Sequence, residues 1–113
     1  MCSSDLKPGR VGGLTNAIEI HRLCAEAGIP CWVGGMLESA LGASLCVSLA
    51  MLDNFTYPAD IFPSSRFYHE DLCERPLELI RLADGTPGVV AEPSPEPHPD
   101  RLRRLCVQSV DLR

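Results

Sequence analysis

Long apolar runs and a surplus of basic residues are both missing from this sequence. No stretch approaches the roughly 18 consecutive apolar residues that a membrane span needs, and the opening MCSSDLKPGR lacks the basic front and apolar centre of a signal peptide. The formal net charge is −5, which argues against a general nucleic-acid surface, because neutralising phosphates takes clustered Lys and Arg. We therefore expect a cytoplasmic protein with neither a membrane nor a nucleic acid as partner.

Paired cysteine motifs are also missing, although the chain contains six cysteines. No C-x-x-C pair occurs, and the three histidines lie apart from the cysteines. Cys24, Cys31 and Cys46 fall inside apolar patterns, where a free thiol behaves as a small hydrophobic side chain. The pattern therefore favours buried, reduced thiols over a disulfide framework or a zinc site.

Apolar periodicity predicts alternating helices and strands in the first half of the chain. Residues 14–28 carry apolar side chains at helical spacing and end in a glycine followed by Ile-Pro. PCWVGG predicts a short buried strand, residues 41–52 predict a helix that is apolar on nearly every side, and NFTYPADI predicts a further strand whose place is limited by its proline. With a short strand before the first helix, this order predicts βαβ units and a parallel sheet.

Beyond residue 64 the pattern weakens. Residues 81–90, around ADGTPG, predict a hairpin or turn. EPSPEPHPD predicts extended chain, because proline at alternate positions excludes a helix or a central strand. A short helix is predicted from residue 100 to about residue 107.

The predicted sheet is incomplete. A parallel sheet is normally covered on both faces, and unpaired strand edges are a liability. Two and a half βα units cannot close a barrel, and the apolar helix at 41–52 needs neighbours. We therefore expect the chain to be part of a larger fold and not to fold stably as a monomer.

Two glycine-rich segments, LKPGRVGG and VGGMLES, follow predicted strands, where active sites of parallel α/β proteins form. Lys7 would point from the first of them into the mouth of a barrel, where a lysine can serve as a proton-transfer base. Spacing alone also leaves Lys7 open as a solvated surface residue. GRVGG matches neither a P-loop nor G-x-G-x-x-G, so phosphate binding has little support.

Two longer segments carry several motifs in a fixed order: LKPGRVGGLTNAIEIHRLCAEAGIPCWVGGMLESALG and LAMLDNFTYPADIFPSSRFYHEDL. Together they resemble the o-succinylbenzoate synthases and the related N-acylamino acid racemases of the enolase superfamily, in its muconate-lactonising-enzyme-like subgroup. The resemblance implies an α/β fold in which residues 1–72 form a partial (β/α) TIM-type barrel covering roughly strands six to eight. Residues 73–113 would form an irregular C-terminal tail.

The resemblance also implies roles for individual residues. Lys7 matches the catalytic lysine at the end of the sixth strand. The residues that would line the pocket of a small-molecule carboxylate substrate are Gly34, Gly35, Met36 and Phe67. Gly35 would leave room that any side chain would fill, while Met36 and Phe67 have ordinary packing as the alternative interpretation.

The implied chemistry is removal of an α-proton to form an enediolate that Mg²⁺ stabilises. In the dehydration, which belongs to menaquinone biosynthesis, the lysine that matches Lys7 stabilises the anion; in the racemisation it works with a second lysine on the opposite face. The family's Mg²⁺ ligands lie on earlier strands absent from this chain, so we expect no metal ligand here and interpret Glu38 and Asp60 as supporting residues. Full-length family members are implied to be homo-oligomeric.

Some residues depart from the family pattern. MCSSD stands in place of a longer apolar strand, PSPEPHP in place of a glycine-rich turn, and Ala59 in place of a usual glycine. We expect the isolated chain to be inactive. The alternatives are a non-catalytic remnant or interaction module, or a segment of another superfamily member such as a muconate cycloisomerase or a dipeptide epimerase.

Overall fold

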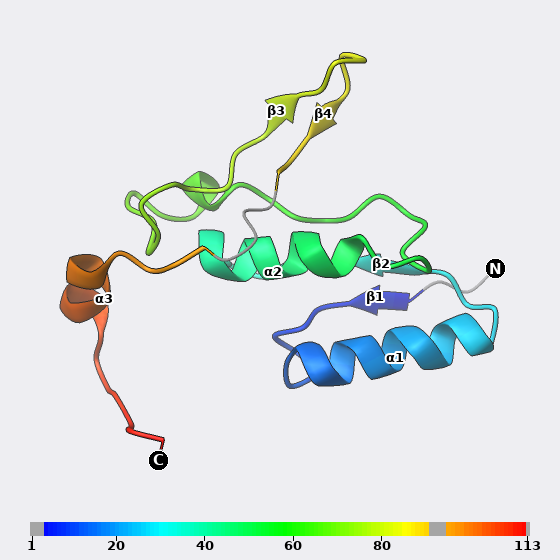
Figure 1. Ribbon diagram of the computed structural model, residues 1–113, viewed down its shortest axis with the longest axis horizontal. Helices are drawn as coiled ribbons and strands as arrows, with labels where there is room; N and C mark the ends of the chain where they lie inside the picture. The colour runs from blue at the N-terminus through cyan, green and yellow to red at the C-terminus, as the bar shows by residue number, and fades with distance from the viewer. Residues whose placement is uncertain (1–3, 91–94, 113) are drawn as a thin grey trace.

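The computed structural model describes residues 4–90 and 95–112 (Figure 1). The elements, in chain order, are β1 (Ser4–Leu6), α1 (Leu14–Glu26), β2 (Cys31–Val33), α2 (Ala40–Ala50), a 3-10 turn η1 (Ser64–Arg66), β3 (Ile80–Arg81), β4 (Pro87–Gly88) and α3 (Pro99–Leu105). The predicted first helix is confirmed, and it ends just before Gly28, whose φ of +67° suits a glycine. The strand predicted within PCWVGG and the helix predicted at 41–52 are confirmed as β2 and α2.

β1 and β2 pair in parallel, with Ser4 opposite Cys31 and Leu6 opposite Val33. Figure 1 shows α1 running alongside β1 and α2 alongside β2. The expected βαβ unit with a parallel sheet is therefore confirmed. Helices connect the strands because parallel pairing needs a crossover of about a dozen residues or more.

The strand predicted at residues 54–61 is wrong as a regular element. The segment lies beside β2 and makes two isolated parallel bridges, Cys31 to Phe55 and Gly34 to Asp60. Pro58 sits between the bridges and has no N–H to donate, so a continuous ladder cannot form there. The segment nevertheless takes the position of a third strand.

Side-chain alternation separates the two faces of the small sheet. Leu6, Cys31 and Val33 are almost completely buried and pack with Ala17 of α1 and with Cys46 and Leu49 of α2. Because successive strand residues point to opposite faces, Asp5, Lys7 and Trp32 lie on the face turned away from this core. The two helices therefore cover one face and leave the other to polar and aromatic side chains.

α2 is covered on two sides, as its apolar sequence predicts. Cys46 and Leu49 belong to the core beneath the sheet, whereas Ala40, Ala43 and Val47 pack with Cys73 and Leu77. Its N-terminus is capped from far along the chain, because the Ala40 amide donates to the buried Asp71 carboxylate at 2.9 Å and the Cys73 amide donates to it at 2.8 Å. Asp71 thus ties the chain after η1 to the start of α2.

The predicted hairpin and the predicted last helix are both confirmed. β3 and β4 pair antiparallel around a turn in which Gly85 has a φ of +85°, and Figure 1 shows this hairpin projecting from the rest of the fold. α3 is two residues shorter at its end than predicted, and Arg101 docks it by donating to the Asp71 and Cys73 carbonyls at 3.1 and 2.6 Å. The predicted extended segment begins outside the described residues.

Cys31, Cys46 and Cys73 are buried, as the apolar surroundings of the first two predicted. None of the helices within residues 4–90 and 95–112 combines the length and the apolar character that crossing a membrane would require.

Candidate functional site

Lys7 follows the last residue of β1 and lies across the sheet toward β2. Its Nζ is 3.3 Å from Asp5 Oδ2, donates to the Gly35 carbonyl at 3.3 Å and lies 5.8 Å from the centre of the Trp32 ring. The side chain is 21% exposed. A carboxylate, a carbonyl and an aromatic face all favour a cation, so these groups together hold an ammonium at the carboxyl end of the parallel strands.

Gly34 provides the space that the Lys7 ammonium occupies. A Cβ at this position would overlap Lys7 Nζ and lie 2.6 Å from Asp5 Oδ1. A Cβ at Gly35 would only make an ordinary contact, 3.6 Å from the Asp60 carbonyl oxygen. Within this structure a side chain at Gly34 would therefore displace Lys7, while the room for substrate expected at Gly35 stays a prediction.

The glycines of GRVGG shape the turn between β1 and α1. The Gly13 amide donates to the Pro8 carbonyl at 2.9 Å, and the Arg10 amide donates to the Lys7 carbonyl at 2.8 Å. Gly12 and Gly13 have φ of +88° and +112°, a region that residues with a side chain rarely adopt. The turn thus connects Lys7, at the end of β1, directly to the start of α1.

Met36 and Glu38 lie beside this turn. Met36 is 45% exposed, its Sδ lies 3.4 Å from where a Cβ of Gly9 would be, and its amide faces Glu38 Oε1 at 3.4 Å. A cavity of about 280 Å³ separates the turn from α2, and Glu38, Gly42 and Cys46 line its α2 side. Burial, reinforced by the Glu38 charge, raises the pKa of the Cys46 thiol to about 11, while the Lys7 charge acts in the opposite direction.

Phe67 and Asp60 are placed differently. Phe67 packs edge-to-face with Phe62 and Tyr68, with ring centres 6.3 and 6.5 Å apart, in an aromatic cluster that follows η1. The structure therefore brings Lys7, Gly34 and Gly35 together but gives Phe67 aromatic partners of its own. Asp60 holds its segment against β2, because its amide donates to the Val33 carbonyl at 2.8 Å and its carbonyl accepts from the Gly35 amide at 2.9 Å.

Two residues of the Lys7 surroundings, Asp5 and Trp32, were missed by the sequence reasoning. Both lie on the same face as Lys7. Alternation away from the apolar positions Leu6 and Val33 is the signal that would have found them. This alternation could not be recognised in the sequence because β1 and β2 are only three residues long each.

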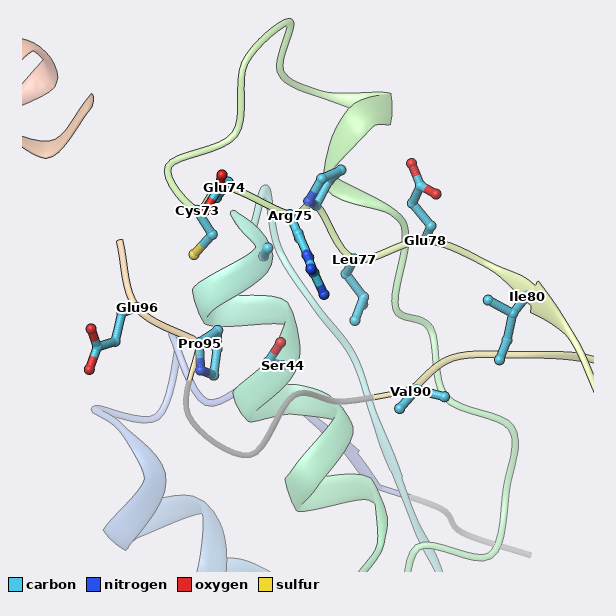
Figure 2. A pocket seen from close by; sticks show the side chains of 12 residues that line it. Ser44, Cys73, Glu74, Arg75, Leu77, Glu78, Ile80, Val90, Pro95 and Glu96 are labelled. Atoms are coloured by element: carbon cyan, nitrogen blue, oxygen red, sulfur yellow. The ribbon is translucent and has the colours of Figure 1, made fainter. Parts of the chain in front are cut away.

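A larger cavity, of about 460 Å³, opens between α2 and the chain that follows η1 (Figure 2). Figure 2 shows the Arg75 side chain reaching toward Ser44 of α2 beside Leu77. Lys7 is not among the described residues that line this cavity. The cavity therefore belongs to the packing of the tail on α2 and not to the lysine site.

Within the part of the chain that the structure describes, no group of three or more His, Cys, Asp or Glu side chains is placed to hold a metal ion. The carboxylate nearest to Lys7, that of Asp5, is engaged with its ammonium group. The residues present do not fit a Mg²⁺ site, and we assign them no step through the metal.

The βαβ unit places Lys7 at the carboxyl end of its first strand, which is where active sites of parallel α/β proteins form. The enolase C-terminal domain-like family matches residues 4–96, and the chain belongs to this family. The resemblance to the enolase superfamily that the motifs indicated is thereby confirmed.

Relatives with related names support this assignment. The chain is 46% identical over 96 residues to an N-succinylamino acid racemase from Amycolatopsis sp, covering 81% of this chain and 26% of that protein. It is 44% identical over 89 residues to an o-succinylbenzoate synthase from Geobacillus stearothermophilus, covering 75% of this chain and 24% of that protein. The chain thus spans about a quarter of the length of the curated relatives it matches.

Solved structures agree with this family assignment. An enolase superfamily member from Listeria innocua has a TM-score of 0.63 and 38% identity, over 82% of this chain and 24% of that one. A dipeptide epimerase from Cytophaga hutchinsonii, solved with Mg and the dipeptide D-Ala-L-Val, has a TM-score of 0.67 and 26% identity, over 90% of this chain and 27% of that one. The family and the α/β fold are therefore established on both sequence and structure.

Proposed function

We propose that this chain supplies the lysine-bearing segment of an enzyme that removes the α-proton of a small carboxylate substrate. The observation that carries the proposal is the Lys7 ammonium, held over Gly34 at the carboxyl end of β1. The names of the relatives, o-succinylbenzoate synthase and N-succinylamino acid racemase, support a dehydration or a racemisation. Both reactions fit one lysine, because both pass through a carbanion next to a carboxylate.

In this proposal Lys7 faces the substrate α-carbon. In racemisation it accepts or returns the α-proton on one face, and in dehydration its charge stabilises the negative charge that develops when the proton leaves. Gly34, Gly35 and Met36 line the pocket near the ammonium, and Phe67 covers the substrate side chain. Mg²⁺ supplies enediolate stabilisation in the whole enzyme, from ligands outside the described residues.

The architecture proposed for the whole enzyme is a (β/α) barrel in which β1, β2 and the 54–61 segment stand roughly as strands six to eight. Residues 1–72 form the barrel portion and residues 73–113 the tail, although the family match continues to residue 96. The isolated chain is inactive in this proposal, since proton removal needs groups that the described residues do not provide. The complete enzyme acts as a homo-oligomer.

A chimaera tests the proposed function. Residues 4–96 replace the corresponding segment of the Amycolatopsis racemase, and the product is assayed for racemisation of an N-succinylamino acid and for o-succinylbenzoate formation. We expect activity in the chimaera and a loss of about 10²-fold or more in Lys7→Ala. Arg22→Lys, on the exposed side of α1, is the control. An active chimaera that keeps its rate in Lys7→Ala would refute the role of Lys7, and an inactive one would favour a non-catalytic remnant.

Dipeptide epimerisation is the second candidate. The chain is 42% identical over 50 residues to a D-Ala-D/L-Ala epimerase from Cytophaga hutchinsonii, and the structural likeness to the dipeptide epimerase covers 90% of the chain. The same chimaera distinguishes the candidates when it is given an N-succinylamino acid and a dipeptide in parallel.

A further inference from the structure

Asp5 and Lys7 share one small volume above Gly34. The two residues are separated by one position of β1, so strand alternation puts both side chains on the same face. Asp5 Oδ2 lies 3.3 Å from Lys7 Nζ, while Asp5 Oδ1 lies 2.6 Å from where a Cβ of Gly34 would be. The carboxylate and the ammonium therefore both occupy the gap that the missing side chain of Gly34 leaves.

The Lys7 ammonium is held from the second strand as well. It donates to the Gly35 carbonyl at 3.3 Å, and Gly35 is itself held, because its amide donates to the Asp60 carbonyl at 2.9 Å. The Trp32 ring lies 5.8 Å away on the same face. A lysine stem is long and flexible, and one acceptor on β1 and another just beyond β2 restrict it to one direction.

We propose that Asp5 is the positioning residue of Lys7, holding its ammonium against the Gly35 carbonyl above Gly34. Asp5 acts only through Lys7 and does not meet the substrate. The consequence for catalysis rests on the proposed function, since it assumes that the substrate α-carbon lies on this face. The positioning itself does not rest on it.

The sequence offers a direct way to observe Lys7. It is the only lysine of the chain, so an amine-selective acylating reagent modifies no other lysine within residues 4–96. Because proline follows Lys7, trypsin does not cut after it, and acylated and free Lys7 lie in the same peptide, which ends at Arg10. Tandem mass spectrometry of that peptide separates Lys7 from any other amine in it and yields the acylation rate of Lys7.

The rate is compared in the chimaera that carries residues 4–96, because the isolated chain is not expected to fold stably, and in its variants Asp5→Asn, Asp5→Ala and Asp5→Glu. Partly exposed ion pairs are weak, with Asp5 34% and Lys7 21% exposed, so we expect Asp5→Asn and Asp5→Ala to acylate about threefold faster. Asp5→Glu keeps the carboxylate and should stay within about twofold of the unchanged chimaera. Glu19→Gln, on the exposed side of α1, is the control and should leave the rate unchanged.

A second variant guards against simple loss of folding. Gly34→Ala leaves Asp5 intact but places a methyl group where Lys7 Nζ lies, so it should also accelerate acylation while the helical circular dichroism persists. Equal rates in the unchanged chimaera, Asp5→Asn and Asp5→Ala would overturn the proposal. So would an unchanged chimaera whose Lys7 reacts as fast as the free peptide MCSSDLKPGR. The assay involves no turnover, so a Lys7→Ala chimaera that stays active would refute the proposed function and leave this result standing.

Discussion

Gly34 and Gly35 form a matched pair for testing the site. Neither has a positive φ among the described residues, so alanine is conformationally tolerated at both. At Gly34 the new methyl group would overlap Lys7 Nζ and lie 2.6 Å from Asp5 Oδ1, whereas at Gly35 it would lie 3.6 Å from the Asp60 carbonyl oxygen. Chemically identical substitutions one residue apart therefore differ in whether they displace the lysine.

The expected size of the difference follows from this geometry. Relief of the overlap at Gly34 takes a movement of the ammonium of about 1 Å, and a reacting group misplaced by that distance loses about 10² in rate. In the chimaera, Gly34→Ala should lower kcat about 100-fold, while Gly35→Ala should leave kcat within a few-fold and act on KM if Gly35 lines the pocket.

The difference in kcat is measured by steady-state kinetics of the two variants, with melting temperatures as the control for folding. Insertion of a methylene into a packed site costs about 1–3 kcal/mol, so some loss of stability accompanies Gly34→Ala and does not by itself explain a kcat effect below the melting range. Equal kcat values in Gly34→Ala and the unchanged chimaera, or a larger kcat loss in Gly35→Ala, would refute the placement of Lys7 over Gly34.

Three further predictions concern stability. Asp71→Ala removes the acceptor of the Ala40 and Cys73 amides and should destabilise the chimaera by about 2–3 kcal/mol in urea denaturation, against less than about 1 kcal/mol for Asp84→Ala in the exposed hairpin turn; similar costs would contradict the cap. Burial raises the pKa of Cys46 from 9.0 to about 11, so the folded state retains a proton that the unfolded chain loses. Cys46 should therefore contribute a fall in stability of roughly 2 kcal/mol between about pH 9 and pH 11. Cys46→Ala should remove that part and leave the part due to Cys31, whose pKa burial also raises to about 11; a fall of unchanged size in the variant would contradict the assignment to Cys46. The 113-residue chain alone should show no cooperative thermal transition as a dilute monomer, since its sheet edges are open; a sharp, reversible transition would contradict this.

The helices were predictable because their signals are local. The apolar stripe of α1 ends at a glycine whose left-handed conformation closes the helix, and α2 has apolar residues on every side because it is packed on two. The segment at 54–61 was not predictable from its alternating Phe55 and Tyr57, because the proline that interrupts the ladder outweighs the alternation. The periodicity of apolar residues indicates which face of a segment is buried, but it does not show whether every residue has an N–H for the strand ladder.

The candidate site also has parts with local signals and parts without them. The position of Lys7 at a strand end was predictable from a motif, whereas the residues that contact it depend on pairing between strands. The register of β1 on β2 puts Asp5 and Lys7 above Gly34 rather than Gly35, and a shift of one residue would move every side chain to the other face. The cap of α2 by Asp71 joins residues 31 positions apart, and no local pattern announces such a contact.

The contacts that hold Lys7 come from β1, from the residues that follow β2 and from the segment beside them, all within residues 4–61. The described residues contain no group of three or more His, Cys, Asp or Glu placed to hold a metal ion. Placement of the ammonium and completion of the reaction centre are therefore separable properties, of which the first belongs to this βαβ unit. This separation is why acylation of Lys7 and turnover can give independent answers in one chimaera. A Lys7 that reacts as fast as the free peptide in an active chimaera would overturn its positioning by Asp5 and leave the proposed function standing.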